Sequence, residues 1–188
     1  MKVKFVNGFK IRNTIDPNFG GHYTRDYAAY IPRGEIWIED YLRPELDLFL
    51  QVVKMEKKFF SQKKTFTELR NFLISEAKKN GFPPNFCMRT ERKGKLKIIH
   101  VDGRIVRKYL DPYFVSGGHE FVYSYVPKNE IWIDARNYKE EQSFVIAHEL
   151  FERRLMAKGR DYHSAHDFAI AEEKHHRRLA GVAQFITG

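Results

Sequence analysis

The residues best suited to chemistry stand close together near the C-terminal end of the 188-residue chain. His148 and Glu152 are four residues apart, so in an α-helix they lie one above the other on the same face. An imidazole and a carboxylate at this spacing are typical of two ligands of one metal ion. Glu149 follows the histidine and points about 100° around the helix, toward where a water on that metal would lie. We therefore predict that His148 and Glu152 bind a metal and that Glu149 is the catalytic carboxylate.

A second helix is expected to face the first one. Gly159 is the residue type that ends a helix in the left-handed conformation, so the chain should reverse there and form an antiparallel helix pair. Residues at equal distance from such a turn lie at equal depth, which brings His166 and Glu173 alongside the first two ligands. These two residues are two helical turns apart and share a face. Together with His148 and Glu152, they make a set of four potential metal ligands.

Several alternatives stay open at the level of the sequence. Either His166 or Glu173, or both, could ligate directly. Such a ligand set suits Zn²⁺ but also another divalent transition metal such as Fe or Mn, and the ion could be catalytic or structural. His119, which follows two glycines, could reach the pocket to orient a substrate or stabilise an oxyanion, or it could be a plain loop residue. A charged helix pair is also ordinary on a protein surface, where Glu152 would pair with Arg153, Arg154 or a neighbouring lysine.

These residues resemble a known pattern. His148-Glu149 is similar to the start of the H-E-x-x-H helix of zinc peptidases, with Glu152 in place of the second histidine. The stretch 148–173 resembles one found in uncharacterised phage and bacterial proteins grouped with zincin-like metallopeptidases, through His148-Glu149-Leu150, Glu152-Arg153, Met156, Lys158-Gly159, Tyr162, Ala165-His166, Ala169 and Glu173. The resemblance implies a metal-dependent hydrolase, with peptide or amide hydrolysis as the leading activity. It implies no particular substrate.

The basic composition points to a second class of function. The chain has a formal net charge of +9 at pH 7, and its basic residues concentrate in the stretch 54–64, at Lys78 and Lys79, and in the stretch 89–97. Such a surface could bind nucleic acid, although no zinc-finger, helix-turn-helix or RNP sequence accompanies it. The alternative function is therefore a non-catalytic basic interaction module that binds nucleic acid or a protein partner, with a structural metal or none.

Composition also bounds the class of protein. With 43% hydrophobic residues the chain is expected to be globular, and it contains no apolar run long enough to span a membrane and no secretory signal pattern. A single cysteine, Cys87, excludes an internal disulfide framework and fits a reducing compartment. We therefore expect a cytoplasmic protein without a membrane partner.

An internal duplication organises the rest of the chain. At an offset of 95 residues, positions 2–38 return as positions 97–133, with 13 identities in 37 positions. The same offset places none of the five candidate site residues on a similar residue, so the site is expected in the second copy only. The two copies are expected to pack about a pseudo-two-fold axis, which would make the chain a monomer.

The predicted fold class is α+β, internally duplicated, with antiparallel strands followed by an antiparallel helix pair in each copy. Asn7-Gly8 and Asp102-Gly103 stand between apolar runs and predict two-residue hairpin turns. The strand at 130–134 is expected to present an edge to an extended peptide. Helices are predicted at 44–60 and 66–80 in the first copy, and at 139–158 and 164–183 in the second. The domain prediction is a first copy over 1–80, a basic linker over 81–95 and a second copy over 96–188.

Overall fold

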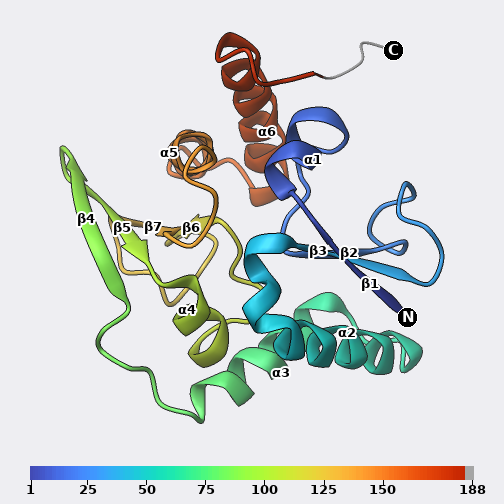
Figure 1. The fold of residues 1–188 in the computed structure, drawn as a ribbon. Helices are drawn as coiled ribbons and strands as arrows, with labels where there is room; N and C mark the ends of the chain where they lie inside the picture. The colour runs from blue at the N-terminus through green and yellow to red at the C-terminus, as the bar shows by residue number, and fades with distance from the viewer. Residues whose placement is uncertain (185–188) are drawn as a thin grey trace.

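The computed structural model describes residues 1–184 and shows an α+β protein built on two β-sheets (Figure 1). The first copy contains β1 (Lys2–Val6), α1 (Gly8–Thr14), β2 (His22–Thr24), β3 (Glu35–Glu39), the 3-10 helix η1 (Asp40–Glu45), α2 (Leu46–Ser61) and α3 (Phe66–Lys78). The second copy and the segment before it contain β4 (Cys87–Lys93), β5 (Leu96–Val101), α4 (Gly103–Tyr109), β6 (Gly117–His119), β7 (Glu130–Asp134), α5 (Gln142–Met156) and α6 (Tyr162–Leu179). The predicted α+β class is confirmed, but one strand pair in each copy is parallel and not antiparallel as predicted. Residues 185–188 of the predicted second copy lie outside the described residues.

The duplication seen in the sequence is also present in the structure. α1 and α4 begin and end at equivalent residues, and so do β3 and β7. In each copy the short helix, α1 or α4, carries a buried arginine. Its guanidinium donates a hydrogen bond to the carboxylate at the end of β3 or β7, which has a paired strand on each side. Arg12 binds Glu39 in this way at 3.0 Å, and Arg107 binds Asp134 at 2.7 Å. The two copies therefore share a polar core as well as a strand pattern.

The predicted hairpin turns are wrong, because Asn7-Gly8 and Asp102-Gly103 both start helices. The side chains of Asn7 and Asp102 accept hydrogen bonds from backbone N–H groups of the following turn, so each residue is a helix N-cap. Asparagine and aspartate before glycine suit either role. An added Cβ at Gly8 or Gly103 would lie 1.9 or 2.1 Å from the carboxylate that ends the central strand, which explains the glycines. The helix allows the flanking strands to pair in parallel, β1 with β3 and β5 with β7.

The strand orders are β1-β3-β2 in the first sheet and β4-β5-β7-β6 in the second. β7 lies between β5 and β6, so both of its edges are paired and the predicted open edge at 130–134 is wrong. β4 occupies much of the segment expected as a linker. It pairs antiparallel with β5 and forms the outer edge of the second sheet.

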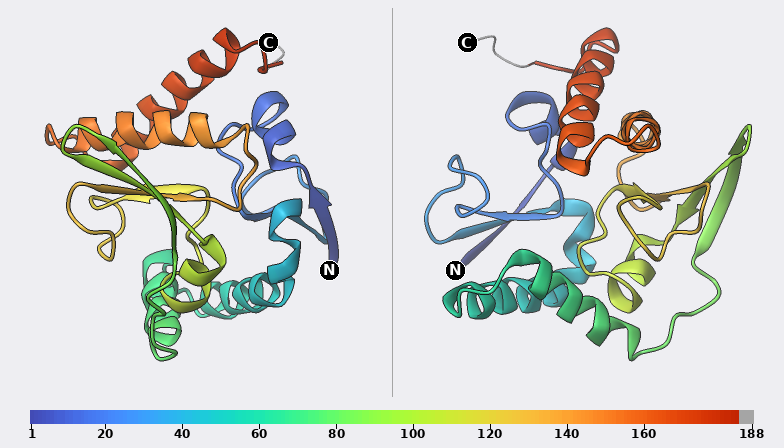
Figure 2. Two further views of the ribbon diagram at one scale, coloured as in Figure 1. Left: turned by 60° about the vertical axis from the view of Figure 1, so that its left-hand side comes forward. Right: turned by 180° about the vertical axis from the view of Figure 1, so that it is seen from behind.

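The four predicted helices are present, with ends that differ from the prediction by a few residues. α2 packs Phe49 and Val53 against the first sheet. α5 packs Val145 against Ile131 and Ile133 and lies along one face of the second sheet (Figure 2). None of the helices in residues 1–184 is both long and apolar enough to cross a membrane.

The two copies contact each other reciprocally. α6 of the second copy lies beside α1 of the first, and α3 of the first lies against α4 of the second (Figures 1 and 2). Arg12 donates through Nε to Glu141 of the second copy at 2.7 Å, and Arg107 donates through Nε to Glu45 of the first copy at 2.7 Å. Reciprocal pairs of this kind are typical of halves related by a two-fold axis.

The helix pairs correspond at an offset one residue longer than that of the strands. The buried positions of α2 and α5 match in this register as Phe49 with Val145, Val52 with His148, Val53 with Glu149 and Glu56 with Glu152. The N-caps Thr65 and Asp161 fit the same offset. The expectation that Glu152 has no counterpart is therefore wrong, because Glu56 is its counterpart. In the next helix Arg70 corresponds to His166, and Ala77 corresponds to Glu173.

Candidate metal centre

The turn between α5 and α6 forms as the sequence indicates. Gly159 has a φ of +89°, in the left-handed region that favours glycine, and it follows the end of α5. Asp161 caps α6 by accepting a hydrogen bond from the backbone N–H of Ser164. Ala165 and Ala169 are fully buried, and their small side chains let α6 approach α5 closely. Polar side chains of the two helices consequently face each other across a short gap.

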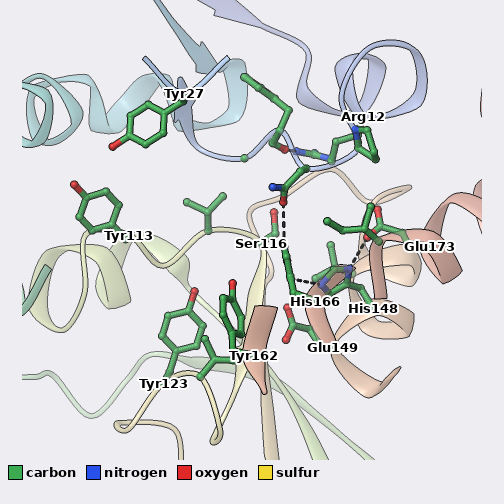
Figure 3. Close-up of a pocket in the computed structure, with 18 of the residues that line it drawn as sticks. Arg12, Tyr27, Tyr113, Ser116, Tyr123, His148, Glu149, Tyr162, His166 and Glu173 are labelled. Atoms are coloured by element: carbon green, nitrogen blue, oxygen red, sulfur yellow. Dashed lines mark hydrogen bonds and ion pairs between the residues drawn. The ribbon is translucent and has the colours of Figure 1, made fainter. Parts of the chain in front are cut away.

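The four predicted ligands meet in this gap, and Figure 3 shows three of them, His148, His166 and Glu173. His166 Nδ1 lies 2.6 Å from Glu152 Oε2 and 3.2 Å from His148 Nε2. His148 Nε2 lies 3.5 Å from Glu152 Oε2. These three atoms converge on one point, whereas Glu173 lies behind His148, with its Oε2 at 2.8 Å from Nδ1 of that ring.

Glu173 fixes the orientation of His148. Because its Oε2 accepts the proton of His148 Nδ1, the other ring nitrogen is turned toward the convergence point. Its Oε1 accepts from Nε of the fully buried Arg177 at 2.8 Å, and Arg177 also binds Glu141. Burial alone would raise the pKa of Glu173, but the bonds to His148 and Arg177 outweigh burial and lower it. Glu173 therefore stays ionised behind the histidine.

His166 is oriented from the first copy. Its Nε2 lies 3.1 Å from Oδ1 of Asn18, in the loop between α1 and β2. An amide oxygen only accepts hydrogen bonds, so Nε2 carries the ring proton and Nδ1 presents a lone pair. Metal-ligating histidines are typically held in this way by an acceptor on the second nitrogen. Sequence reasoning missed Asn18, because the residue lies far away in the chain and has no motif of its own.

The convergence point requires a cation. Lone pairs of two imidazoles and an oxygen of a carboxylate face the same place, and only a proton or a metal ion between them relieves the repulsion. A tetrahedral zinc with bonds of about 2.0–2.1 Å separates its ligand atoms by roughly 3.3 Å, so the closest pair would open by roughly 0.7 Å. Burial disfavours a charged His148, but hydrogen bonds to Glu152 and Glu173 outweigh burial and raise its pKa to about 10. The donor set therefore fits a divalent metal that displaces this proton.

His119 reaches the cluster as a neighbour of Glu152. It is fully buried, and its Nε2 lies 3.0 Å from Glu152 Oε1. The backbone N–H of Phe121 donates to its Nδ1, so the ring proton is on Nε2 and is donated to Glu152. One potential ligand atom from each of His119, Glu149 and Glu152 lies within 4.8 Å of the other two. The proton on Nε2 nevertheless leaves no lone pair on His119 for a second ion. His119 thus holds one oxygen of Glu152 and leaves the other one facing His148 and His166.

Glu149 stands beside the ligands without a partner of its own. It is 9% exposed, and the structure shows no hydrogen bond or ion pair to its carboxylate among residues 1–184. Burial raises the pKa of Glu149 to about 7; His148 opposes this shift and Glu152 adds to it. A carboxyl group with a pKa near neutrality can both take up and release a proton at neutral pH.

A cavity of about 760 Å³ opens in front of the cluster, between the two copies. His148, Glu149 and His166 line one side of it. Tyr27 and Tyr113 lie across the cavity from them (Figure 3). The cluster is therefore accessible to a molecule of the size of a short peptide segment.

Comparisons with known proteins found no relative. No family model, no curated protein and no solved structure matches the chain.

Proposed function

We propose that the protein is a metal-dependent hydrolase of peptide or amide bonds, with a zincin-like arrangement on α5 and α6. The observation that carries this proposal is the convergence of His148 Nε2, His166 Nδ1 and Glu152 Oε2, each turned to one point by a neighbouring group. The resemblance of the stretch 148–173 to zincin-like sequences agrees with this geometry.

The three converging residues are the proposed metal ligands, and the favoured ion is Zn²⁺ because two imidazoles and one carboxylate suit it. Iron or manganese accepts the same ligand types. A bound ion supplies Lewis acidity, which polarises a carbonyl group and lowers the pKa of water. Glu173, Asn18 and His119 act as positioning residues, since each one holds a proposed ligand.

Glu149 is the proposed catalytic residue. Its carboxylate faces the cavity beside the ligands and has no other partner in the described residues. It is placed to take a proton from the attacking water and to return this proton to the nitrogen of the leaving amine. The carboxylate thus performs both proton transfers that hydrolysis of an amide requires.

The Glu149→Gln variant tests this assignment. We expect wild-type protein loaded with zinc to release new amino groups from denatured casein, and we expect the variant to retain the metal but to lose at least about 100-fold in rate, as is usual when a general base is removed. His176→Ala is the matched control, because His176 is an exposed residue on α6. Equal hydrolysis by the Glu149→Gln and wild-type proteins would remove Glu149 from the mechanism.

A second function is favoured by the β4–β5 hairpin, which projects from the second sheet (Figure 1). Its exposed basic residues are Arg89, Arg92, Lys93 and Lys95. Binding of nucleic acid at this hairpin would weaken steeply with salt and would not depend on metal. Replacing these four residues by serine should abolish such binding, and retained binding would exclude the hairpin as the contact surface.

A further inference from the structure

Four large aromatic side chains surround the cavity and remain exposed. Tyr27 and Phe66 are each 42% exposed, Phe121 is 46% exposed and Tyr162 is 39% exposed. All four line the same cavity, although they come from four separate segments in both copies. Isolated exposed aromatic residues are ordinary, but a group of them around one cavity indicates a binding surface.

The aromatic wall of the cavity, formed by Tyr27, Phe66 and Tyr113, is fixed by hydrogen bonds and ring packing. Oε1 of the buried Glu56 accepts hydrogen bonds from Tyr27 Oη at 2.7 Å and from Tyr113 Oη at 2.9 Å, and it lies 3.2 Å from His22 Nε2. Phe66 packs edge-on against Tyr113 with ring centroids 4.9 Å apart. A ligand that contacts these rings meets side chains that are already fixed, so binding does not have to order them.

The charges that face the cavity favour a peptide over a nucleic acid. Of the described residues that line it, the two arginines Arg12 and Arg70 are already bound to carboxylates. Glu149 and Asp167 also line the cavity. A phosphodiester chain would bring its negative charge against them, which is unfavourable. A peptide brings neutral amide groups, and an aromatic side chain can stack on the tyrosine rings.

We propose that this aromatic wall, formed by Tyr27 and Phe66 of the first copy and Tyr113 of the second, binds a large aromatic side chain of a peptide substrate. The proposal rests on the hydrolase function, because it assigns the part of the cavity next to the metal centre. The first copy thus contributes two of the three rings that would bind the substrate, next to a centre whose proposed ligands belong to the second copy.

Equilibrium binding to the zinc-loaded Glu149→Gln protein tests the proposal without turnover. The probes are short blocked peptides that differ in one position, which is phenylalanine, tryptophan, alanine or glutamate. Burying one aromatic side chain should make the phenylalanine peptide bind about 10- to 100-fold more tightly than the alanine peptide. Phe66→Ala and Tyr27→Ala, each added to this protein, should reduce this preference to nearly one.

Phe60→Ala is the matched control, because Phe60 is also 42% exposed but does not line the cavity. It should leave the preference unchanged, and thermal unfolding of every variant shows that the fold is retained. Equal binding of the phenylalanine and alanine peptides would overturn the proposal, as would tight binding of a single-stranded oligonucleotide that Phe66→Ala abolishes. A protein that hydrolyses casein without this preference would contradict the aromatic site alone. A protein that keeps the preference but neither binds metal nor hydrolyses casein would contradict the hydrolase function and leave the aromatic site standing.

Discussion

The helix pairs of the two copies share one scaffold but differ in what they bury. Glu56 in the first pair and Glu152 in the second are buried at equivalent positions, and each one lies within hydrogen-bond distance of a histidine from its own sheet, His22 or His119. Around Glu56, tyrosine hydroxyl groups complete the contacts. Around Glu152, two further histidines do so, and a nitrogen of each converges with Glu152 Oε2 on the proposed cation position.

The same comparison explains why the two copies depend on each other. Asn18 and Tyr113 occupy equivalent positions in the Asp-Pro loops of the two copies. Asn18 reaches His166 of the second copy, and Tyr113 reaches Glu56 of the first. The loop of each copy therefore supports the polar group of the other copy. The loop of the first copy thus lies beside the proposed metal centre, and the equivalent loop of the second copy lies at the aromatic wall.

The largest expected effect tests the shared scaffold. Arg12→Ala and Arg107→Ala should each lower the free energy of unfolding by about 3–5 kcal/mol, because each leaves buried carboxylates without their cation. Urea denaturation measures both values. Similar losses would support equivalent roles in the two copies, whereas a loss in only one of them would show that the scaffold is not symmetric.

The next effect concerns Glu149, whose counterpart is Val53. The raised pKa of Glu149 means that its ionised form is less stable in the folded than in the unfolded protein, so it costs stability progressively as the pH rises from about 4.5 to about 7. Glu149→Val should remove this cost and raise the free energy of unfolding at pH 7.5 by about 1–3 kcal/mol in chelator.

The difference between wild type and Glu149→Val should shrink at pH 4, where the carboxyl group is protonated in both states. Urea denaturation at the two pH values checks this expectation. A variant that is less stable than wild type at pH 7.5 would contradict an unpaired, buried carboxylate.

The smallest effect separates the two equivalent loop residues. Asn18→Ala should weaken zinc binding about 10- to 100-fold, since it removes the acceptor that orients His166. Tyr113→Phe, at the equivalent position, should leave zinc affinity unchanged because its hydroxyl group binds Glu56. Competition with a fluorescent chelator measures both zinc affinities. Equal affinities of the two variants would show that Asn18 does not support zinc binding.

The helix pair and its side chains were predictable because the information is local. The spacing of His148 and Glu152, the glycine at 159 and the small residues of α6 place the side chains together without knowledge of the rest of the fold. The hairpins at Asn7-Gly8 and Asp102-Gly103 were predicted wrongly because the same dipeptides can cap a helix. The choice between a hairpin and a helix depends on the carboxylate at the end of β3 or β7, which packs so close to the glycine that a Cβ would clash with it.

Contacts between the copies could not be read from the chain. Asn18 and His166 are far apart in sequence, and only the packing of α6 near the first copy brings them together. The counterpart of Glu152 was missed because one residue is added before the helices of the second copy, and identities there are too few to reveal it. The burial pattern of α2 and α5 corrects the register.

The most direct test of the central claim is the metal content of the purified, untagged protein, measured by elemental analysis beside two variants. We expect about one equivalent of zinc, or of another divalent transition metal, in wild type. The same amount is expected in Glu56→Gln, which changes the equivalent carboxylate of the first copy, and almost none in the His148→Ala, Glu152→Ala double variant. No metal in the wild-type protein after growth and reconstitution with zinc, or equal metal in all three proteins, would contradict a metal centre between α5 and α6.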